Sequence, residues 1–513
     1  MKKTVLTFII SLFILYVYGQ EFSDYFTTQQ LRFDYIHGGD SNHDNYFFKE
    51  IFQEPYWGGP QTLQPDNSKY GLYKFKLIDI ASGNIIYSQG YNTLFSEWQV
   101  TPEAKKLSKA MVESVIMPFP KNDVRIELYK RNIATGEDIL MMEYTINPNS
   151  KFINKKSSSE YETVEILNNG NPEECIDLVL LPEGYCETEM NAFISSCQTL
   201  TDALFEISPY KEYKEKFNVW AVKAPSVESG IDVPYMNVWK NTIFNSNFST
   251  FDIDRYCMTE DYASVRNVAS SVPYDYVYVV VNTDIYGGGA IYNWYGMSSA
   301  NMAIGGYVLA HELGHLFAGL GDEYEGEDAF SEMYPLNVEP FDANLTTLVD
   351  FASKWADLVE EDTPVPTPIT PQFVNKVGAF EGGGYVSNGV YRPYQNCMMR
   401  NYAPFCPVCL RTMCKIFDNL TGVETESIKE SNIDKETKIV LHPNPTKNYL
   451  YFSSNMGNGK TYNVIISDIN GKTVNQQDVT DKIDVKNLLT GTYIISFYQD
   501  KQLIETLRFI KNK

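Results

Sequence analysis

The stretch HELGHLFAGLGDEY, residues 311–324, carries the side chains best suited to chemistry. Residues four apart on a helix share a face, so His311 and His315 can converge on one metal ion. Glu312 lies beside them, where a carboxylate can take a proton from a zinc-bound water of lowered pKa. The rest of YVLAHELGHLFAGL is apolar, and polar groups inside such a helix need partners. The stretch therefore predicts one Zn²⁺ per chain, with Glu312 as the catalytic general base.

The two histidines need a third protein ligand, and the histidine count points to a carboxylate. The chain has only five histidines. The three besides His311 and His315 belong to the terminal parts of the sequence: His37, His43 and His442. No third histidine is therefore at hand in the central region.

The turn after the helix holds the predicted third ligand. In the HExxHxxGxxH pattern of metzincins, this ligand follows the second histidine by six residues. Gly321 occupies that place here, and Asp322 comes one residue later. Gly319 and Gly321 allow the chain to leave the helix and turn back. We expect Asp322 to be the third ligand, with a later carboxylate, Glu325 or Glu327, as the alternative.

Other residues are predicted to support the site. Glu323 is expected to support a ligating histidine through a contact with the ring on the side away from the metal. Downstream, QNCMMRNY, residues 395–402, is typical of the methionine turn beneath a metzincin metal, with Met398 or Met399 in the turn. A methionine pair is otherwise core filler. Tyr402 is a candidate to reach the metal or an oxyanion, and surface packing is its alternative role.

A glycine-rich stretch is a candidate for the edge strand that pairs with substrate. GGGAIYNWY, residues 287–295, leaves room for another backbone to approach closely. In metzincin-like sites an edge strand pairs with extended substrate. Gly288, Gly289 and Tyr292 are therefore candidate substrate-binding residues, and a plain loop is the alternative.

Three regions must position these residues. Residues 163–420 read as mixed α/β, with buried-type strands in ECIDLVLLPEGY, KFNVWAVKA and YDYVYVVVNTD and a helical period in MNAFISSCQTLTDALFEISPY. Residues 20–155 alternate apolar and polar residues and predict a β-sandwich, with a linker at 147–162. Residues 436–513 predict a small all-β module with Asn-Gly and Thr-Gly turns. The predicted fold is multidomain.

Length, charge and the N-terminal run restrict the class of protein. The 513 residues suffice for about three domains at ~150 residues each. The net charge of −23 argues against binding of nucleic acid or anionic membranes, and suits an exported protein. Residues 1–19 read as a signal peptide, with an uncleaved anchor as the alternative. No later run predicts a membrane span. Bound calcium is a minor expectation.

The eight cysteines all lie between residues 175 and 414. An even count in an exported chain permits disulfides, whose pairing the sequence does not give. The closely spaced set Cys397, Cys406, Cys409 and Cys414 fits a structural metal site only loosely.

Two family resemblances follow from longer motifs. IDLVLLPEGY, ESGIDVP, VNTDIYGGGAIYN, AHELGHLFAGLGDEY, FEGGGY, NCMMR and FCPVC together resemble the IgA-specific metallopeptidase family, and the N-terminal β unit resembles that family's accessory domain. HPNPTKNYLYF, DINGK and LLTGTYIISF resemble the C-terminal sorting domain of the type IX secretion system of Bacteroidetes. The resemblances imply a metal-dependent endopeptidase, with His311, His315 and Asp322 as ligands, that reaches the cell surface or medium through the outer membrane.

The sequence favours a secreted zinc endopeptidase acting on protein or peptide substrates, with the type IX machinery as export partner. The alternative is a surface-binding or adhesion protein whose peptidase-like core is inactive. A zinc amidase acting on glycan-linked peptide is a third hypothesis.

Overall fold

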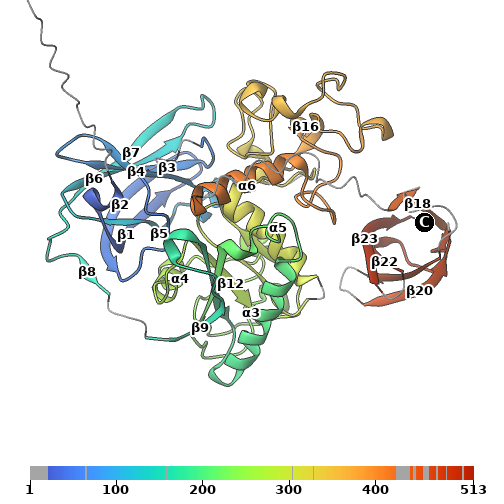
Figure 1. The fold of residues 1–513 in the computed structure, drawn as a ribbon, viewed down its shortest axis with the longest axis horizontal. Coiled ribbons are helices and arrows are strands. Elements are labelled where there is room, and N and C mark those ends of the chain that lie inside the picture. The colour runs from blue at the N-terminus through green and yellow to red at the C-terminus, as the bar shows by residue number, and fades with distance from the viewer. Residues whose placement is uncertain are drawn as a thin grey trace, which may run out of the picture.

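The computed structural model describes residues 21–63, 66, 68–156, 160–302, 304–326, 329–422, 439–442, 446–454, 461–468, 472–480, 482–499 and 502–512. The predicted signal peptide, residues 1–19, lies outside this set. Along the described chain, Figure 1 shows an N-terminal β unit in blue, a central unit of helices and strands, and a C-terminal β unit in red. The predicted multidomain layout is confirmed.

The N-terminal unit is a sandwich of two four-stranded sheets, ordered β5-β1-β2-β8 and β4-β3-β6-β7. Alternate residues point inward: Phe33 of one sheet and Phe75 and Leu77 of the other share one buried core. The predicted β-sandwich is therefore confirmed. Its elements are α1 Phe22–Tyr25, β1 Phe26–Gly39, β2 Asp44–Glu54, β3 Tyr73–Asp79, β4 Ile85–Tyr91, α2 Leu94–Gln99, β5 Lys109–Pro120, β6 Val124–Arg131, β7 Asp138–Ile146 and β8 Asn154–Lys155.

The predicted linker at 147–162 is partly structured. Within it, β8 pairs in parallel with β2, with Phe52 opposite Asn154. The polar composition of this stretch fits an exposed edge strand, and both residues of β8 are exposed.

The central unit is built on a six-stranded sheet ordered β13-β14-β12-β10-β11-β9. Strands β14, β12, β10 and β11 run parallel, and the two edge strands are antiparallel to their neighbours. Parallel strands that are covered on both faces of the sheet need apolar side chains on both faces. This explains the uninterrupted run of apolar residues in YVYVVV, the sequence of β12. The strands are β9 Glu162–Leu167, β10 Ile176–Glu183, β11 Phe217–Lys223, β12 Tyr276–Val281, β13 Gly288–Ala290 and β14 Gly296–Ser299.

The two faces of this sheet bury different partners. Tyr278 and Val280 pack with helices α3, α5 and α6, whereas Val277 and Val279 pack with α4 and with the N-terminal sandwich. This alternation, which follows from the two-residue period of a strand, holds α5 against one face of the sheet. The helices are α3 Met190–Leu204, α4 Tyr262–Ala269, α5 Gly305–Ala318 and α6 Pro407–Thr421, and a hairpin of β15 Phe380–Gly383 and β16 Val386–Arg392 precedes α6.

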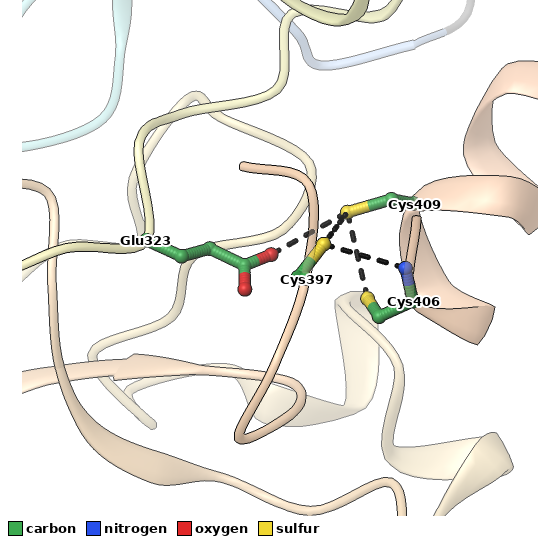
Figure 2. Close-up of side chains that lie close together, drawn as sticks. All are labelled: Glu323, Cys397, Cys406 and Cys409. Carbon is green, nitrogen blue, oxygen red and sulfur yellow. Dashed lines mark hydrogen bonds between the residues drawn. The ribbon is translucent and has the colours of Figure 1, made fainter. Parts of the chain in front are cut away.

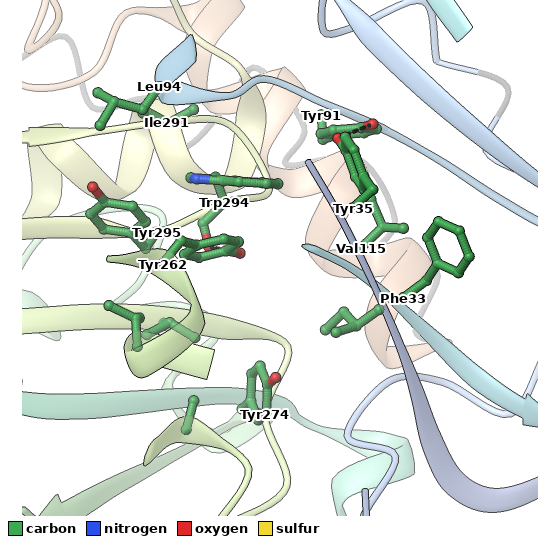
Figure 3. Packing of buried hydrophobic residues seen from close by; sticks show 14 of the residues in the cluster. Phe33, Tyr35, Tyr91, Leu94, Val115, Tyr262, Tyr274, Ile291, Trp294 and Tyr295 are labelled. Atoms are coloured by element: carbon green, nitrogen blue, oxygen red, sulfur yellow. Dashed lines mark hydrogen bonds between the residues drawn. The ribbon is translucent and has the colours of Figure 1, made fainter. Parts of the chain in front are cut away.

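Aromatic stacking joins the N-terminal sandwich to the central unit. Trp294 lies between Tyr262, at 3.9 Å between ring centroids, and Tyr91 of β4, at 5.9 Å. Figure 3 shows this stack beside Tyr35 and other buried side chains of the sandwich. The neighbouring Asn293 Nδ2 donates to the carbonyl of Gly90 across the same boundary at 2.7 Å. The two units therefore share a continuous buried core.

The C-terminal unit has a core of its own, built by a three-stranded sheet β17-β18-β21 and a four-stranded sheet β20-β19-β22-β23. Among the described residues, no helix has the length and apolar character needed to cross a membrane. The strands are β17 Ile439–His442, β18 Tyr449–Ser454, β19 Tyr462–Asp468, β20 Thr473–Val479, β21 Lys482–Asp484, β22 Gly491–Gln499 and β23 Gln502–Lys511.

The shared core makes a prediction about stability. Trp294 is 3% exposed, and Trp294→Ala should lower the free energy of unfolding by about 3–5 kcal/mol, because the surrounding rings cannot fill the cavity. Trp239, which is 62% exposed, provides the control, and its alanine variant should change stability by no more than about 0.5 kcal/mol. Denaturant unfolding measures both. Equal effects of the two variants would show that the stack does not hold the units together.

Candidate metal centre

Helix α5 carries the HELGH sequence and ends where the chain must turn. Its apolar residues are buried around most of its circumference, between the sheet and helices α3 and α6. Gly319 follows the helix in the left-handed conformation, at φ 54°, which favours glycine. A Cβ on Gly319 would also lie 3.3 Å from the ring of Tyr292. The chain therefore leaves the helix at the glycine that the sequence suggested.

The turn brings Asp322 to the two histidines. Oδ1 of Asp322 lies 3.3 Å from Nε2 of His311 and 3.5 Å from Nε2 of His315, and the two Nε2 atoms are 3.2 Å apart. Ligand atoms about 2.0–2.1 Å from a tetrahedral zinc lie about 3.3–3.4 Å from one another. The three distances between the ligand atoms therefore match the ligand-to-ligand distances of a tetrahedral zinc site.

The other ring nitrogens of the histidines are occupied. Nδ1 of His311 is 2.9 Å from the carbonyl oxygen of Met398, and Nδ1 of His315 is 2.5 Å from that of Leu320. A carbonyl only accepts hydrogen bonds, so both Nδ1 atoms carry the proton. This fixes the ring orientation and leaves both Nε2 lone pairs directed at the shared point, as in metal-ligating histidines.

Asp322 presents one oxygen to the protein and one to the histidines. Oδ2 accepts hydrogen bonds from the hydroxyls of Tyr324, at 2.9 Å, and Tyr385. Oδ1 is buried and has no hydrogen-bond partner among the described residues. Burial alone would raise the pKa of Asp322, but the facing histidines hold it well below its ordinary value. A buried anionic oxygen without a hydrogen-bond partner, facing two imidazole nitrogens, fits the binding of a divalent cation.

Two more carboxylates lie around this point. Glu312 is next to His311 on α5, and burial raises its pKa while the nearby histidines oppose the rise. Glu97, on α2 of the N-terminal sandwich, accepts a hydrogen bond from Tyr256. Burial raises the pKa of Glu97 to about 7, and the charges of His315 and the other site residues also act on it. The N-terminal sandwich therefore reaches the surroundings of the metal centre.

The methionine pair contributes a backbone contact and a packing contact. The carbonyl of Met398 holds His311, as described above. The sulfur of Met399 lies under α5, 3.0 Å from where a Cβ of Gly314 would be. The carbonyl of Met399 also accepts from the backbone N–H of Glu323 at 2.7 Å. Both methionines thus adjoin the HELGH helix, and Gly314 provides the space for one of them.

The prediction that Glu323 holds a ligating histidine is wrong. Its carboxylate points away from the histidines and accepts from Asn344 Nδ2, at 2.9 Å, and from the thiol of Cys409, at 3.4 Å. Adjacent side chains in this turn point to opposite sides, so that Asp322 and Glu323 face different partners. The alternative ligand Glu325 lies 3.2 Å from Arg400, and Glu327 is outside the described residues.

Tyr402 packs against α5. Its ring stacks on that of Tyr307, with centroids 4.0 Å apart, and the Tyr307 hydroxyl donates to the carbonyl of Met398. Of the two roles considered for Tyr402, the structure thus shows packing. The tyrosines that contact Asp322 are Tyr324 and Tyr385.

The glycine-rich stretch does approach another backbone closely, but that backbone belongs to the same chain. The backbone N–H of Gly288 donates to the carbonyl of Arg255 at 3.2 Å, and the carbonyl of Gly288 accepts from the backbone N–H of Cys257 at 3.5 Å. A Cβ on Gly289 would lie 2.3 Å from the ring of Tyr256. The outer edge of β13 is thus covered by residues 255–257, and the structure gives no support to substrate pairing at Gly288 and Gly289.

Tyr292 is likewise no open substrate contact. It is 6% exposed and its ring packs against Gly319, while its carbonyl accepts from Asn92 of the N-terminal sandwich at 3.0 Å. Tyr292 lies in the boundary between the two units, and the structure gives no support to its role as a substrate-binding residue.

Sequence reasoning missed Tyr385 and Glu97. Tyr385 lies 63 positions after the aspartate that it contacts, and Glu97 belongs to another domain. The only signal for Tyr385 was its place after the glycines of EGGGY. Gly384, at φ 59°, and Tyr385 itself, at φ 62°, both adopt the left-handed conformation that turns the hairpin between β15 and β16.

An α/β domain whose HExxH helix meets a downstream carboxylate is the arrangement of a metallopeptidase. A family model described as IgA Peptidase M64 matches residues 164–375 and 369–417, and a model of the Peptidase M64 N-terminus matches residues 21–140. A model of a secretion system C-terminal sorting domain matches residues 440–512. A comparison with curated proteins gave no match.

The chain belongs to the M64 peptidase family, with the accessory N-terminal domain and a C-terminal sorting domain. It is a secreted or cell-surface peptidase. The resemblances to the IgA peptidase family, to its N-terminal domain and to a secretion sorting domain are thereby confirmed.

The tyrosine contacts make a prediction about metal affinity. Tyr385→Phe removes one hydroxyl from Asp322 Oδ2 and keeps the ring, so the affinity of the site for a divalent metal such as Zn²⁺ should fall about 10–100-fold, as for other residues that orient metal ligands. Tyr391→Phe, on the same hairpin, is the control and should bind as the wild type does. Competition with a zinc-binding dye measures both. Unchanged affinity of Tyr385→Phe would show that its hydroxyl does not hold the ligand.

Proposed function

We propose that this secreted peptidase is a zinc-dependent endopeptidase that hydrolyses peptide bonds of extracellular proteins, with His311, His315 and Asp322 as the zinc ligands and Glu312 as the catalytic base. The observation that carries the proposal is the unpartnered Oδ1 of Asp322, 3.3 and 3.5 Å from the Nε2 atoms of the two histidines. Zinc suits this set because it favours nitrogen and carboxylate ligands in tetrahedral geometry.

Zinc bound by these three side chains supplies a Lewis acid that polarises a substrate carbonyl and lowers the pKa of water. His311, His315 and Asp322 would hold the metal, and a site with three protein ligands would still be able to take up water or substrate. The two histidine side chains are 17% and 16% exposed, whereas Asp322 is buried, so a substrate would approach from the side of the histidines.

The chain's own residues move the protons. The Glu312 carboxylate takes a proton from the attacking water and passes it to the leaving amine. Glu312 adjoins the ligand His311 in the sequence, which keeps its carboxylate beside the proposed metal. The hydroxyls of Tyr324 and Tyr385 keep Asp322 Oδ2 occupied, so that Oδ1 stays directed at the histidines.

The export route is part of the proposal. The sorting domain is of the kind that the type IX secretion machinery reads, so that machinery is the proposed export partner. The family's name mentions IgA as a substrate, but the name alone does not assign IgA as a substrate of this chain. For this chain the proposed substrates are extracellular proteins or peptides as a class.

Glu312→Gln tests the catalytic base. The amide cannot accept the proton, so kcat should fall by about 10²–10⁴-fold or more while bound zinc stays at the wild-type level. Glu206→Gln is the control, because Glu206 is 80% exposed and should not affect cleavage. Cleavage of an unfolded protein such as casein, with metal analysis of the same samples, is the measurement. Wild-type turnover by Glu312→Gln would rule out the assigned role.

Chelation tests the metal. Protein stripped by a chelator should lose cleavage, and added Zn²⁺ should restore it, whereas Ca²⁺ should not, because two of the three ligands are imidazole nitrogens and calcium prefers oxygen. Full activity in the stripped protein, or recovery with Ca²⁺ alone, would contradict the proposal.

A further inference from the structure

A second group of metal-binding side chains lies on the other side of the turn. The carboxylate of Glu323 and the thiols of Cys397, Cys406 and Cys409 all place a ligand atom within 4.8 Å of one another, and all four residues are buried. Figure 2 shows the three sulfurs gathered at the end of the glutamate side chain. This is a separate cluster from the one formed by the histidines.

The four residues come from three segments. Cys397 directly precedes Met398, Cys406 is the N-cap of α6, and Cys409 lies in the first turn of that helix. Residues three apart on a helix are neighbours, which brings Cys406 and Cys409 together. Cys414, the fourth cysteine of the set noted in the sequence, lies five residues further along α6 and hence about 140° around the helix from Cys409. The fourth residue of the cluster is therefore Glu323 and not Cys414.

The sulfur spacing fits a shared metal better than a disulfide. Sγ of Cys409 lies 3.7 Å from that of Cys397 and 3.5 Å from that of Cys406. A disulfide bond is about 2.05 Å long. Zinc–thiolate bonds of about 2.3 Å place two sulfurs of a tetrahedral site about 3.8 Å apart. All eight cysteines are free thiols in the structure.

Burial of the glutamate calls for a positive partner. Glu323 is 0% exposed, and its Oε2 is buried without a hydrogen-bond partner among the described residues. Its Oε1 accepts from Asn344 Nδ2 and from the thiol of Cys409, both of them neutral donors. Burying a carboxylate without compensating charge is costly. A cation at the centre of the cluster would engage this oxygen and the three sulfurs together.

We propose that Cys397, Cys406, Cys409 and Glu323 bind a second Zn²⁺ with a structural role. Four protein ligands close the coordination shell, as is typical of structural zinc. Three soft thiolates disfavour calcium and magnesium, and the hard carboxylate favours zinc over copper(I).

This second site braces the first. Glu323 follows Asp322, and its backbone N–H donates to the carbonyl of Met399. Cys397 precedes Met398, whose carbonyl holds Nδ1 of His311. A metal at the cluster thus ties the turn after α5, the methionine turn and the start of α6 to one point. The bracing role rests on the proposed function, whereas the metal site itself does not.

Metal content per chain tests the site on the full-length secreted protein. Elemental analysis should find two zinc ions in the wild type and one in a His311→Ala/His315→Ala double variant, which keeps only the cysteine cluster. Cys409→Ser should lose the second zinc. Cys414→Ser, on the same helix, is the matched control and should keep two. No zinc in the histidine double variant would overturn the proposal, even if the peptidase function holds.

Cobalt replacement decides the ligands without relying on a cysteine variant that folds. In the His311→Ala/His315→Ala protein, Co²⁺ should show the charge-transfer absorption of thiolate ligands. Thiol labelling of the metal-free protein should find Cys397, Cys406 and Cys409 all reduced. Cobalt without a thiolate signal, or a disulfide between any two of the three, would overturn the site. Failure of cleavage with both metals bound would contradict only the proposed function.

Discussion

Two neighbouring carboxylates, Asp322 and Glu323, are both buried, and this is the constraint around which the site is arranged. A buried carboxylate needs hydrogen bonds and opposite charge, because its desolvation costs several kcal/mol. Each of the two keeps one oxygen without a hydrogen-bond partner among the described residues, and each faces its own set of metal-ligating atoms. In this account two cations, one on each side of the turn, satisfy both charges.

The rest of the fold holds that turn in place. The sheet fixes α5, Gly319 ends the helix, and Asn344 anchors the turn by accepting from Gly321 N–H and donating to its carbonyl. The hairpin between β15 and β16 supplies Tyr385, and the N-terminal sandwich packs on the opposite face of the sheet. An accessory domain that shares a core with the catalytic unit and brings Glu97 near its centre is part of the peptidase's architecture.

What the sequence predicted well was local. The four-residue spacing of His311 and His315 and the glycine after their helix placed Asp322 beside them. The strand and helix patterns likewise gave the three units. What it missed was set by distant contacts: the direction of Glu323 depends on cysteines 74 to 86 positions away, and Tyr385 comes from a later hairpin.

The glycine-rich stretch shows the same limit in another form. Its composition correctly indicated a close backbone approach, but glycine permits approach by any chain. Only the fold shows that Arg255 and Cys257 already occupy the edge at Gly288. The burial of Tyr292 has a related cause, since it depends on a domain boundary that the local sequence pattern does not reveal.

The most direct test of the two-cation account is anomalous X-ray diffraction from crystals of the protein at the zinc absorption edge. Two anomalous peaks per chain are expected, one among His311, His315 and Asp322 and one among Cys397, Cys406, Cys409 and Glu323. A chain with no peak at the histidines would contradict the zinc peptidase mechanism. A chain with a peak there and a disulfide in place of the second would contradict the bracing role of the cysteine cluster.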